Sequence, residues 1–202
     1  PTSPRLTPLK KSTKNNAMNR RQKDLQEHII KNRSCALCEI SRYTYKKVFY
    51  RGLLPCTYLF IGEAPGETEN ILGQPFVGRS GQLLDTIIDE AGIPVSKVAF
   101  TNTILCAPFT DKYCEEMRAP LKEEIANCSS RLREFIEIAF PKIVIAVGSE
   151  SKNALTKMKI VFEHILHPAF ILRKGGKASV EYARTVLKLK EIHLHEIKTK
   201  TS

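Results

Sequence analysis

Four side chains in this sequence could do chemistry: Glu63 just after an apolar run, Phe76 in the loop that follows, Asn102 inside another apolar run and His167 directly after a third. A carboxyl group one turn beyond a buried strand can have a raised pKa, which suits base catalysis. An amide inside an apolar strand must find hydrogen bonds, either from neighbouring backbone or from the edge of a bound base. The proline after His167 holds that residue extended, although a lone histidine is more often structural than catalytic.

The loop that carries Glu63 and Phe76 is rich in turn-forming residues. Residues 62–81 contain five glycines and two prolines, which let the backbone approach a ligand closely. The loop enters a helix N-terminus at Ser80-Gly81, a natural place for a phosphate. It is neither a P-loop nor a dinucleotide fingerprint, so a purely structural connection explains the glycines equally well. The carboxyl group and the aromatic ring favour a ligand site.

The elements that position these residues follow from apolar periodicity. The expected strands are 57–61, 98–105, 142–147 and 160–166, and the expected helices are 21–31, 81–91, 120–140, a short one from 149, and 180–194. This order predicts an α/β fold, a three-layer α/β/α sandwich with a mostly parallel central sheet of about four strands. Ligands sit at the carboxyl ends of such strands, so the loops 62–79, 106–119 and 167–177 are expected to hold the chemistry.

The 202 residues fit one ordinary globular domain. We expect a flexible basic arm at 1–23, the folded domain at 24–194 and a tail at 195–202. The arm has seven Lys or Arg and no acid, residues 24–166 have 17 basic and 18 acidic residues, and residues 167–202 have eight and three. Positive charge at both ends of a neutral domain suits polyanion binding, and a solvated tail is the alternative. No apolar stretch is long enough for a membrane span.

Three motifs occur in order along the chain: GEAPG-x-x-E-x-x-x-G-x-PFVG-x-SG-x-LL, an Asn four residues before a Cys, and HPA-x-x-LR. Together they resemble the family 4 uracil-DNA glycosylases, the iron–sulfur branch of that superfamily, from about Ser34 to Arg173. The resemblance implies a DNA repair enzyme that flips uracil out of the stack and hydrolyses its N-glycosidic bond, leaving an abasic site.

The resemblance also implies a role for each residue of the motifs. His167 donates to uracil O2, and Glu63 positions or deprotonates the attacking water. Phe76 stacks on the ring, Asn102 pairs with its N3/O4 edge, and Glu69 crowds C5 against the methyl of thymine. The other substrate-binding and DNA-binding positions are Gly62 and Ala64 beside the base, Arg79 and Ser80 on phosphates, and Ile171, Leu172 and Arg173 as a wedge into the vacated stack.

Six cysteines without an export signal argue against a disulfide framework and predict an intracellular, reducing compartment. Organelle targeting by the acid-free arm is the alternative. The resemblance implies that Cys35, Cys38, Cys106 and Cys128 hold a structural [4Fe–4S] cluster, and by count a zinc ion is the alternative. Cys114 competes with Cys106 as a ligand, because it lies in an insertion before Arg118 that departs from the family pattern.

The implied partner is uracil-containing DNA, single- or double-stranded, with no membrane. We expect a monomer, with membership of a larger replication or repair assembly left open. Two other function classes compete with the enzyme. One is a catalytically silent glycosylase-like module that binds DNA or a replication partner, and the other, suggested only by the cysteines, is a redox cluster protein.

Overall fold

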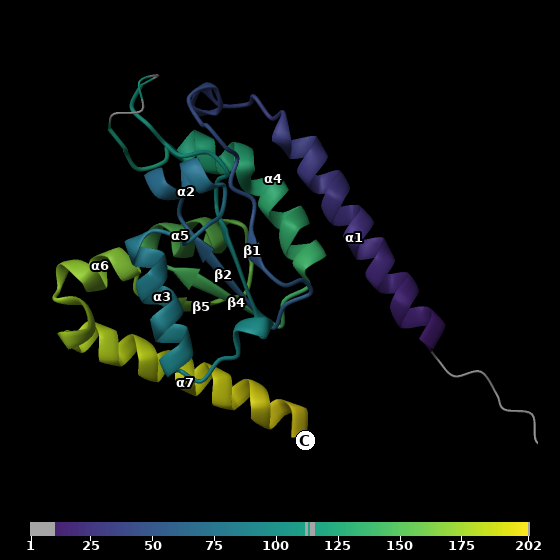
Figure 1. The fold of residues 1–202 in the computed structure, drawn as a ribbon, viewed down its shortest axis with the longest axis vertical. Coiled ribbons are helices and arrows are strands. Elements are labelled where there is room, and N and C mark those ends of the chain that lie inside the picture. Colours follow the sequence, from purple (N-terminus) through teal and green to yellow (C-terminus); the bar gives the residue numbers. More distant parts are fainter. Residues whose placement is uncertain (1–10, 112, 114–115, 202) are drawn as a thin grey trace, which may run out of the picture.

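The structure is a computed structural model that describes residues 11–111, 113 and 116–201 (Figure 1). The helices are α1 (Lys11–Arg33), α2 (Glu67–Leu72), α3 (Arg79–Glu90), α4 (Lys122–Ala139), α5 (Ser149–Lys157), α6 (Pro168–Arg173) and α7 (Val180–Thr201), with 3-10 turns η1 (Glu39–Arg42), η2 (Val95–Lys97) and η3 (Gly176–Ala178). The strands are β1 (Arg51–Gly52), β2 (Tyr58–Gly62), β3 (Val98–Asn102), β4 (Ile143–Val147) and β5 (Glu163–Ile165).

The strands form one sheet in the order β1-β3-β2-β4-β5. All neighbours pair in parallel except β1, which is antiparallel to β3. The expected mostly parallel α/β sandwich is therefore confirmed, but the sheet has five strands instead of about four. The fifth strand, β1, has two residues, which is too short for apolar alternation to reveal it.

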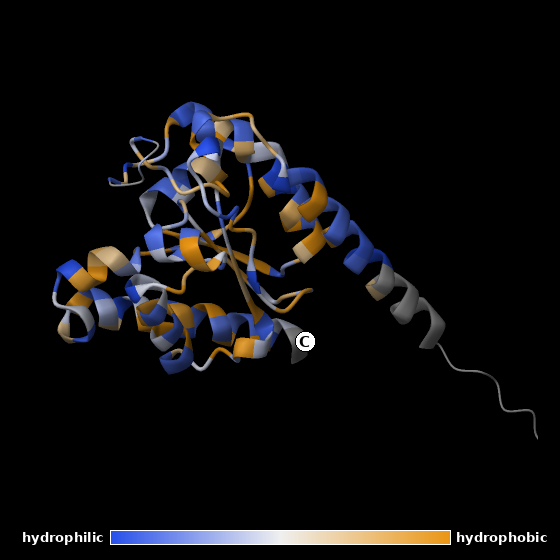
Figure 2. Cartoon of the chain, turned by 45° about the horizontal axis from the view of Figure 1, so that its top comes forward, coloured by the Kyte–Doolittle hydropathy of each residue, from blue (hydrophilic) through white to orange (hydrophobic). Residues whose placement is uncertain are grey.

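Successive side chains of the central strand β2 point to opposite faces of the sheet, and each face has its own core. Tyr58 and Phe60 belong to the core beneath α3, α6 and α7, whereas Leu59 and Ile61 belong to the core beneath α4 and α5. All five residues of β2 are buried, as expected for a parallel strand covered on both faces. In Figure 2 the sheet and the inner sides of the helices are orange, and the outer surfaces are largely blue.

The first and last helices are longer than expected. α1 begins at Lys11, so residues 11–23, expected to be part of a flexible arm, extend the amphipathic segment as one helix. Extending an existing helix is much easier than starting one, which explains why weak periodicity did not end it. α7 runs through the expected tail to Thr201, and residues 1–10 and 202 lie outside the described residues. The three-part division of the chain stays a prediction.

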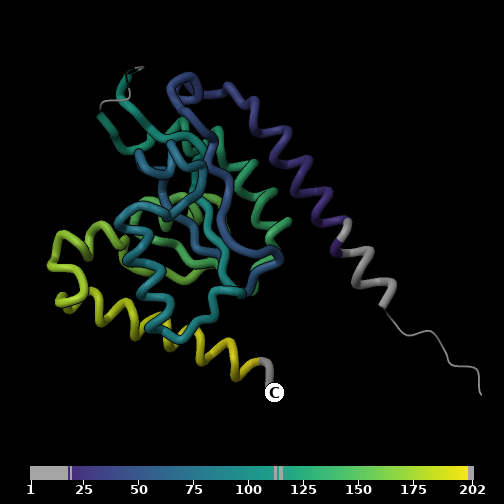
Figure 3. Tube along the Cα trace, viewed as in Figure 1, coloured from purple at the N-terminus to yellow at the C-terminus, as the bar shows by residue number. Residues whose placement is uncertain are grey.

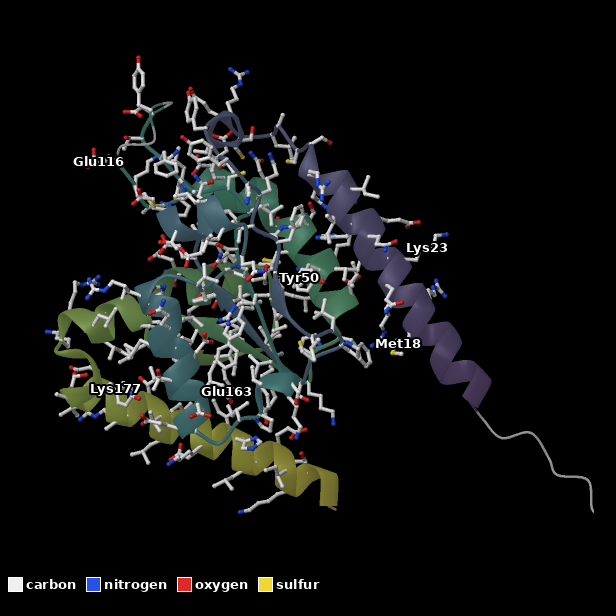
Figure 4. The ribbon with its side chains drawn as sticks, viewed as in Figure 1. Met18, Lys23, Tyr50, Glu116, Glu163 and Lys177 are labelled. Carbon is white, nitrogen blue, oxygen red and sulfur yellow. The ribbon has the colours of Figure 1, made fainter. Side chains whose placement is uncertain are left out.

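α1 and α7 lie on opposite sides of the sheet, as the purple and yellow ends of the tube show in Figure 3. α1 packs along α4, where Glu134 accepts from Lys31 Nζ at 3.2 Å and contacts His28 Nδ1 at 3.2 Å. Lys23 on α1 and Lys177 beside α6 are accordingly far apart in Figure 4. No described helix is long and apolar enough to cross a membrane.

Candidate active site

A pocket of about 470 Å³ opens where β2, β4 and β5 end, and Glu63 and His167 both line it. Glu63 directly follows β2, and His167 lies two residues beyond β5. Gly148, directly after β4, also lines it. The carboxyl edge of a parallel sheet is where ligands bind in this class of fold, and the structure brings the predicted acid and imidazole together there.

His167 is held in a defined orientation by the start of α6. It is the N-cap residue of that helix, its Nδ1 accepts a hydrogen bond from the backbone N–H of Ala169 at 3.1 Å, and Pro168 follows at the first helical position. Burial, and then the charge of Arg173, lower the pKa of His167. The ring is therefore neutral at neutral pH with its proton on Nε2, which makes Nε2 a hydrogen-bond donor.

Gly148 provides the space that His167 occupies. Its φ is +90°, and a Cβ added there would lie 2.9 Å from Cβ of His167 and 3.2 Å from Cδ2. A side chain at this position would be strained and would push the imidazole out of place. The sequence analysis overlooked Gly148, although a glycine directly after a buried strand at the expected ligand edge was the available signal.

Glu63 has the raised pKa that its position predicts. Burial raises the pKa of its carboxyl group, and the nearby Glu150 raises it further. Its backbone carbonyl accepts a hydrogen bond from the Thr103 hydroxyl, which ties the end of β2 to the residue after β3. A partly buried carboxyl group with a raised pKa is a better proton acceptor than an exposed one, provided that it is ionised.

Phe76 and Asn102 meet over Gly62. Gly62 and Asn102 are paired in the register of β2 and β3. A Cβ on Gly62 would lie 2.5 Å from Oδ1 of Asn102 and 2.6 Å from Cζ of Phe76, so only glycine permits this contact. Phe76 is 7% and Asn102 2% exposed, and the Phe76 ring also packs on Phe100 at 5.6 Å between centroids. Phe76 is thus more buried than expected for a stacking residue in a loop.

The four predicted residues therefore form two adjoining pairs. Glu63 and His167 line the pocket, whereas Phe76 and Asn102 lie together over the residue that precedes Glu63 and are not among the residues that line the pocket. That all four face one bound base stays a prediction.

A groove of about 510 Å³ adjoins the pocket and shares Ala169 and Arg173 with it. Four of the five predicted DNA-contacting residues line this groove: Arg79, Ser80, Leu172 and Arg173. The fifth, Ile171, is completely buried and packs in the core of α3 and α7. α6 turns Ile171 inward in the free protein, whereas Leu172 and Arg173 line the groove and are better placed to meet DNA. That Ile171 enters the DNA stack stays a prediction.

Glu69 and Ala64 lie away from the pocket. The Glu69 carboxylate accepts hydrogen bonds from the backbone N–H groups of Val77 and Gly78, at 2.9 and 2.7 Å, and lines the groove. This bracing of the loop differs from the contact with C5 of the base that the resemblance implies. Ala64 packs against the hydrophobic cluster that contains Cys38, Cys106 and Cys128. The loop after β2 therefore contacts both the groove, through Glu69, and the cysteines, through Ala64.

The four predicted metal-ligating cysteines, Cys35, Cys38, Cys106 and Cys128, line one cavity of about 20 Å³. Within the described part of the chain, no three His, Cys, Asp or Glu side chains are arranged to hold a single metal ion. Cys114, the competing ligand, lies outside the described residues. Cys56 is buried elsewhere, and burial raises the pKa of its thiol to about 12, as expected of a cysteine that serves as a small apolar residue.

One further residue joins the cysteines to β3. Arg131 of α4 is 5% exposed, and its Nη2 donates to the carbonyls of Asn102 and Thr103 at 3.0 and 2.9 Å. Burial lowers the pKa of Arg131, while the neighbouring thiols of Cys128, Cys106 and Cys35 act in the opposite direction. The sequence analysis missed this arginine, although an arginine within the apolar stripe of the helix, three residues after Cys128, was a visible signal.

The fold and the site define a class: an α/β protein with a pocket at the carboxyl edge of its sheet, beside a groove that carries arginines. The profile of the uracil DNA glycosylase superfamily matches residues 49–190. The chain belongs to this superfamily, and the resemblance noted from the motifs is confirmed.

Several relatives are type-4 uracil-DNA glycosylases. The chain is 35% identical to that of Sulfurisphaera tokodaii over 70% of its own length and 61% of the relative's. It is 37% identical to that of Saccharolobus solfataricus over 66% and 60% of the two chains, and 31% identical to that of Thermotoga maritima over 77% and 85%. The chain thus spans about 60% of the length of the first two relatives.

Proposed function

We propose that this protein excises uracil from DNA by hydrolysing the bond between the base and its sugar. The observation that carries the proposal is the pairing of Glu63 with His167 in one pocket at the carboxyl edge of the sheet. Membership of the superfamily and the similarity to type-4 enzymes support the choice of substrate.

Cleavage of the glycosidic bond leaves negative charge on uracil and positive charge on the sugar. In the proposal, Nε2 of His167 donates to uracil O2 as the bond between C1′ and N1 breaks and its electron pair moves onto the base. A neutral, preoriented donor stabilises this charge without having to reorganise. The hydrogen bond from Ala169 to Nδ1 is what directs the remaining proton to Nε2.

Glu63 serves the other reactant, the water. Its carboxylate accepts a proton from a water molecule whose oxygen attacks C1′, and the products are an abasic sugar and the uracil anion. The anion takes up a proton from the solvent, and Glu63 returns its own proton to the solvent. The pKa raised by burial increases the affinity of Glu63 for that proton. This role requires the ionised carboxylate in the ground state.

Asn102 and Phe76 select the base. The Asn102 amide can accept from N3–H and donate to O4 of uracil, a pattern that cytosine reverses. Both side chains are almost covered in the free protein, so the entering base must displace the loop that carries Phe76. DNA phosphates are held in the groove by Arg79, Ser80 and Arg173, with Leu172 as the side chain that fills the vacated stack.

The proposed cofactor is a [4Fe–4S] cluster bound by Cys35, Cys38, Cys106 and Cys128. Two observations fit this group: the four thiols line one cavity, and Arg131 beside them has two buried nitrogens, Nε and Nη1, without an oxygen or nitrogen partner. Four thiolates around an iron–sulfur cluster carry net negative charge that such a guanidinium balances. When bound, the cluster joins the chain segments that carry its ligands. Iron and sulfide analysis distinguishes it from zinc.

The test is release of free uracil from oligonucleotides with a single deoxyuridine, single- and double-stranded, with a gel-shift assay on the same DNA. The proposal predicts free uracil and an alkali-sensitive abasic site from at least one of the two substrates. DNA binding without uracil release would instead identify a catalytically silent module. If the protein neither binds this DNA nor releases uracil from it, both the proposed enzyme and the silent DNA-binding module are refuted.

A further inference from the structure

Arg131 is an unusual residue for the interior of this fold. It is 5% exposed, its Nη2 donates to two backbone carbonyls, and its Nε and Nη1 have no oxygen or nitrogen partner, so the thiol of Cys128 is the side chain that pairs with the guanidinium. A buried charge with unpaired donors is strongly destabilising unless an anion compensates it. Among the described residues no Asp or Glu forms an ion pair with it. The anion that compensates it must be something other than a carboxylate.

Arg131 lies near three of the cysteines that line the cavity, and Cys128 shares its face of α4. Cys128 is one turn earlier on α4, and the thiols of Cys128, Cys106 and Cys35 are the acidic groups that lie near the guanidinium. All three belong to the proposed cluster site. Cluster sulfurs are hydrogen-bond acceptors with negative charge, which is what the guanidinium requires.

The hydrogen bonds of Arg131 Nη2 connect it to the candidate active site. Nη2 holds the carbonyls of Asn102 and Thr103, where β3 ends. Thr103 in turn donates its backbone N–H to the carbonyl of Gly62 at 2.9 Å and its hydroxyl to the carbonyl of Glu63. A single guanidinium thus lies between the cysteines and the two backbone segments that carry Asn102 and Glu63.

We propose that Arg131 is a positioning residue that couples the cluster to base recognition: Nε and Nη1 donate to cluster sulfurs while Nη2 fixes the end of β3. The proposal rests on the proposed cluster and function. It assigns the cluster an effect on uracil selection that passes through one side chain. Hydrogen bonds to the sulfurs and a nearby positive charge also raise the reduction potential of a cluster.

The experiment uses the holoprotein purified without oxygen, as wild type, Arg131→Met, Arg131→Lys and Arg133→Met. Arg133 is the matched control, because it lies on the same helix, is exposed, and also donates to a backbone carbonyl, that of Met158 at 2.6 Å. The readouts are the loss of visible cluster absorbance in excess chelator, the reduction potential of the cluster, and kcat/KM for uracil release.

Arg131→Met is expected to lose its cluster about 10–100-fold faster than wild type, as outer-shell substitutions at metal sites do. Its potential should be lower, and kcat/KM should fall in the fraction that still holds a cluster. Arg131→Lys keeps the positive charge, but a single ammonium group cannot bind both the cluster and the carbonyls at the end of β3. Its cluster lifetime should therefore lie between those of wild type and Arg131→Met. Arg133→Met should match wild type in all three readouts.

Wild-type cluster lifetime and potential in Arg131→Met would overturn the proposal, as would a wild-type protein that contains no iron. If Arg131→Met does not fold, as judged by circular dichroism, Arg131→Lys decides by the same readouts. A protein that holds iron but releases no uracil would refute the proposed function alone, because lifetime and potential still report on Arg131.

Discussion

The two ends of the sheet use polar side chains in opposite ways. At the amino end, the hydroxyl of Tyr58, the first residue of β2, lies 2.7 Å from Nδ1 of His193 on α7, and both groups are buried. At the carboxyl end of the same strand, Glu63 and His167 line a pocket. Polar groups that pair inside the protein stabilise it, whereas groups held toward a cavity are available to a ligand.

The side chains of the site also shape the backbone at the carboxyl end. At the carboxyl end, Gly62 and Gly148 are needed because side chains of the site occupy the space where their Cβ atoms would be, and Phe76 has a φ of +57°. Such close packing around polar side chains is typical of sites where orientation matters more than stability. The comparison predicts that substitutions at the carboxyl end mainly change activity and those at the amino end mainly change stability.

Glu63→Gln should have the largest effect on activity. It removes the proton acceptor, so kcat is expected to fall by about 10²–10⁴-fold in single-turnover uracil release. Folding raises the pKa of Glu63, so its stabilising contribution is full below the unfolded-state pKa and is lost as pH rises through the folded-state pKa. Glutamine removes this loss, and the Tm at neutral pH should therefore rise. A lower Tm together with normal activity would contradict both statements.

His167→Ala should lower kcat by about 10²–10³-fold, the usual result of removing one donor to a developing anion. Because the variant also loses the side-chain cap of α6, the free energy of unfolding should fall by about 1 kcal/mol, which is too little to unfold the protein at the assay temperature. The same oligonucleotide assay and a thermal melt check this prediction. Retention of full excision activity by the folded variant would remove His167 from the mechanism.

Gly148→Ala tests whether the space beside His167 matters. The added methyl lies 2.9 Å from Cβ of His167, and displacement of a catalytic group by about 1 Å can lower the rate about 10²-fold. Gly92→Ala is the matched control, because Gly92 also has a positive φ, of +76°, but has nothing within 4 Å of the added atom. Both variants should lose some stability, and only Gly148→Ala should lose activity.

The pH dependence of kcat/KM should change less than the activity does in the variants above. Glu63 must be ionised and His167 neutral, so both requirements fail toward acid, and kcat/KM should fall about tenfold per pH unit below the pKa of Glu63. Since the pKa of His167 is lowered, it stays neutral below its ordinary titration range. Glu150→Gln removes one cause of the raised pKa of Glu63 and should move the acid limb to lower pH. If the acid side of the pH profile does not move in Glu150→Gln, a group other than Glu63 is responsible for the fall in kcat/KM.

Tyr58→Phe should have no effect on excision. Removal of the hydroxyl leaves Nδ1 of His193 buried without its partner, which typically costs about 1–3 kcal/mol in the free energy of unfolding. Urea denaturation measures this loss, and uracil release at a temperature where both proteins are folded provides the comparison. A large loss of activity would mean that the two ends of the sheet are not independent.

The main strands and helices, and the pocket residues Glu63 and His167, were predictable because apolar runs end next to them. The short elements were not: β1, α2 and α6 are two to six residues long, and local periodicity carries no signal at that length. The resemblance implied that Ile171 is part of the wedge, and without α6 nothing in the sequence indicated that this side chain points into the core. Gly148 and Arg131 each carried a signal in the sequence, but their contacts with His167 and with the carbonyls of Asn102 and Thr103 join segments that are distant in the chain, and the tertiary structure was needed to assign them.

The central claim is that Glu63, Phe76, Asn102 and His167 converge on one base. A crystal structure with DNA that carries 2′-fluoro-deoxyuridine, whose glycosidic bond resists cleavage, tests it directly. The account predicts the uracil ring against Phe76, its N3/O4 edge on the Asn102 amide and its O2 on Nε2 of His167. A base bound in the pocket while Phe76 and Asn102 remain covered by the protein would contradict it.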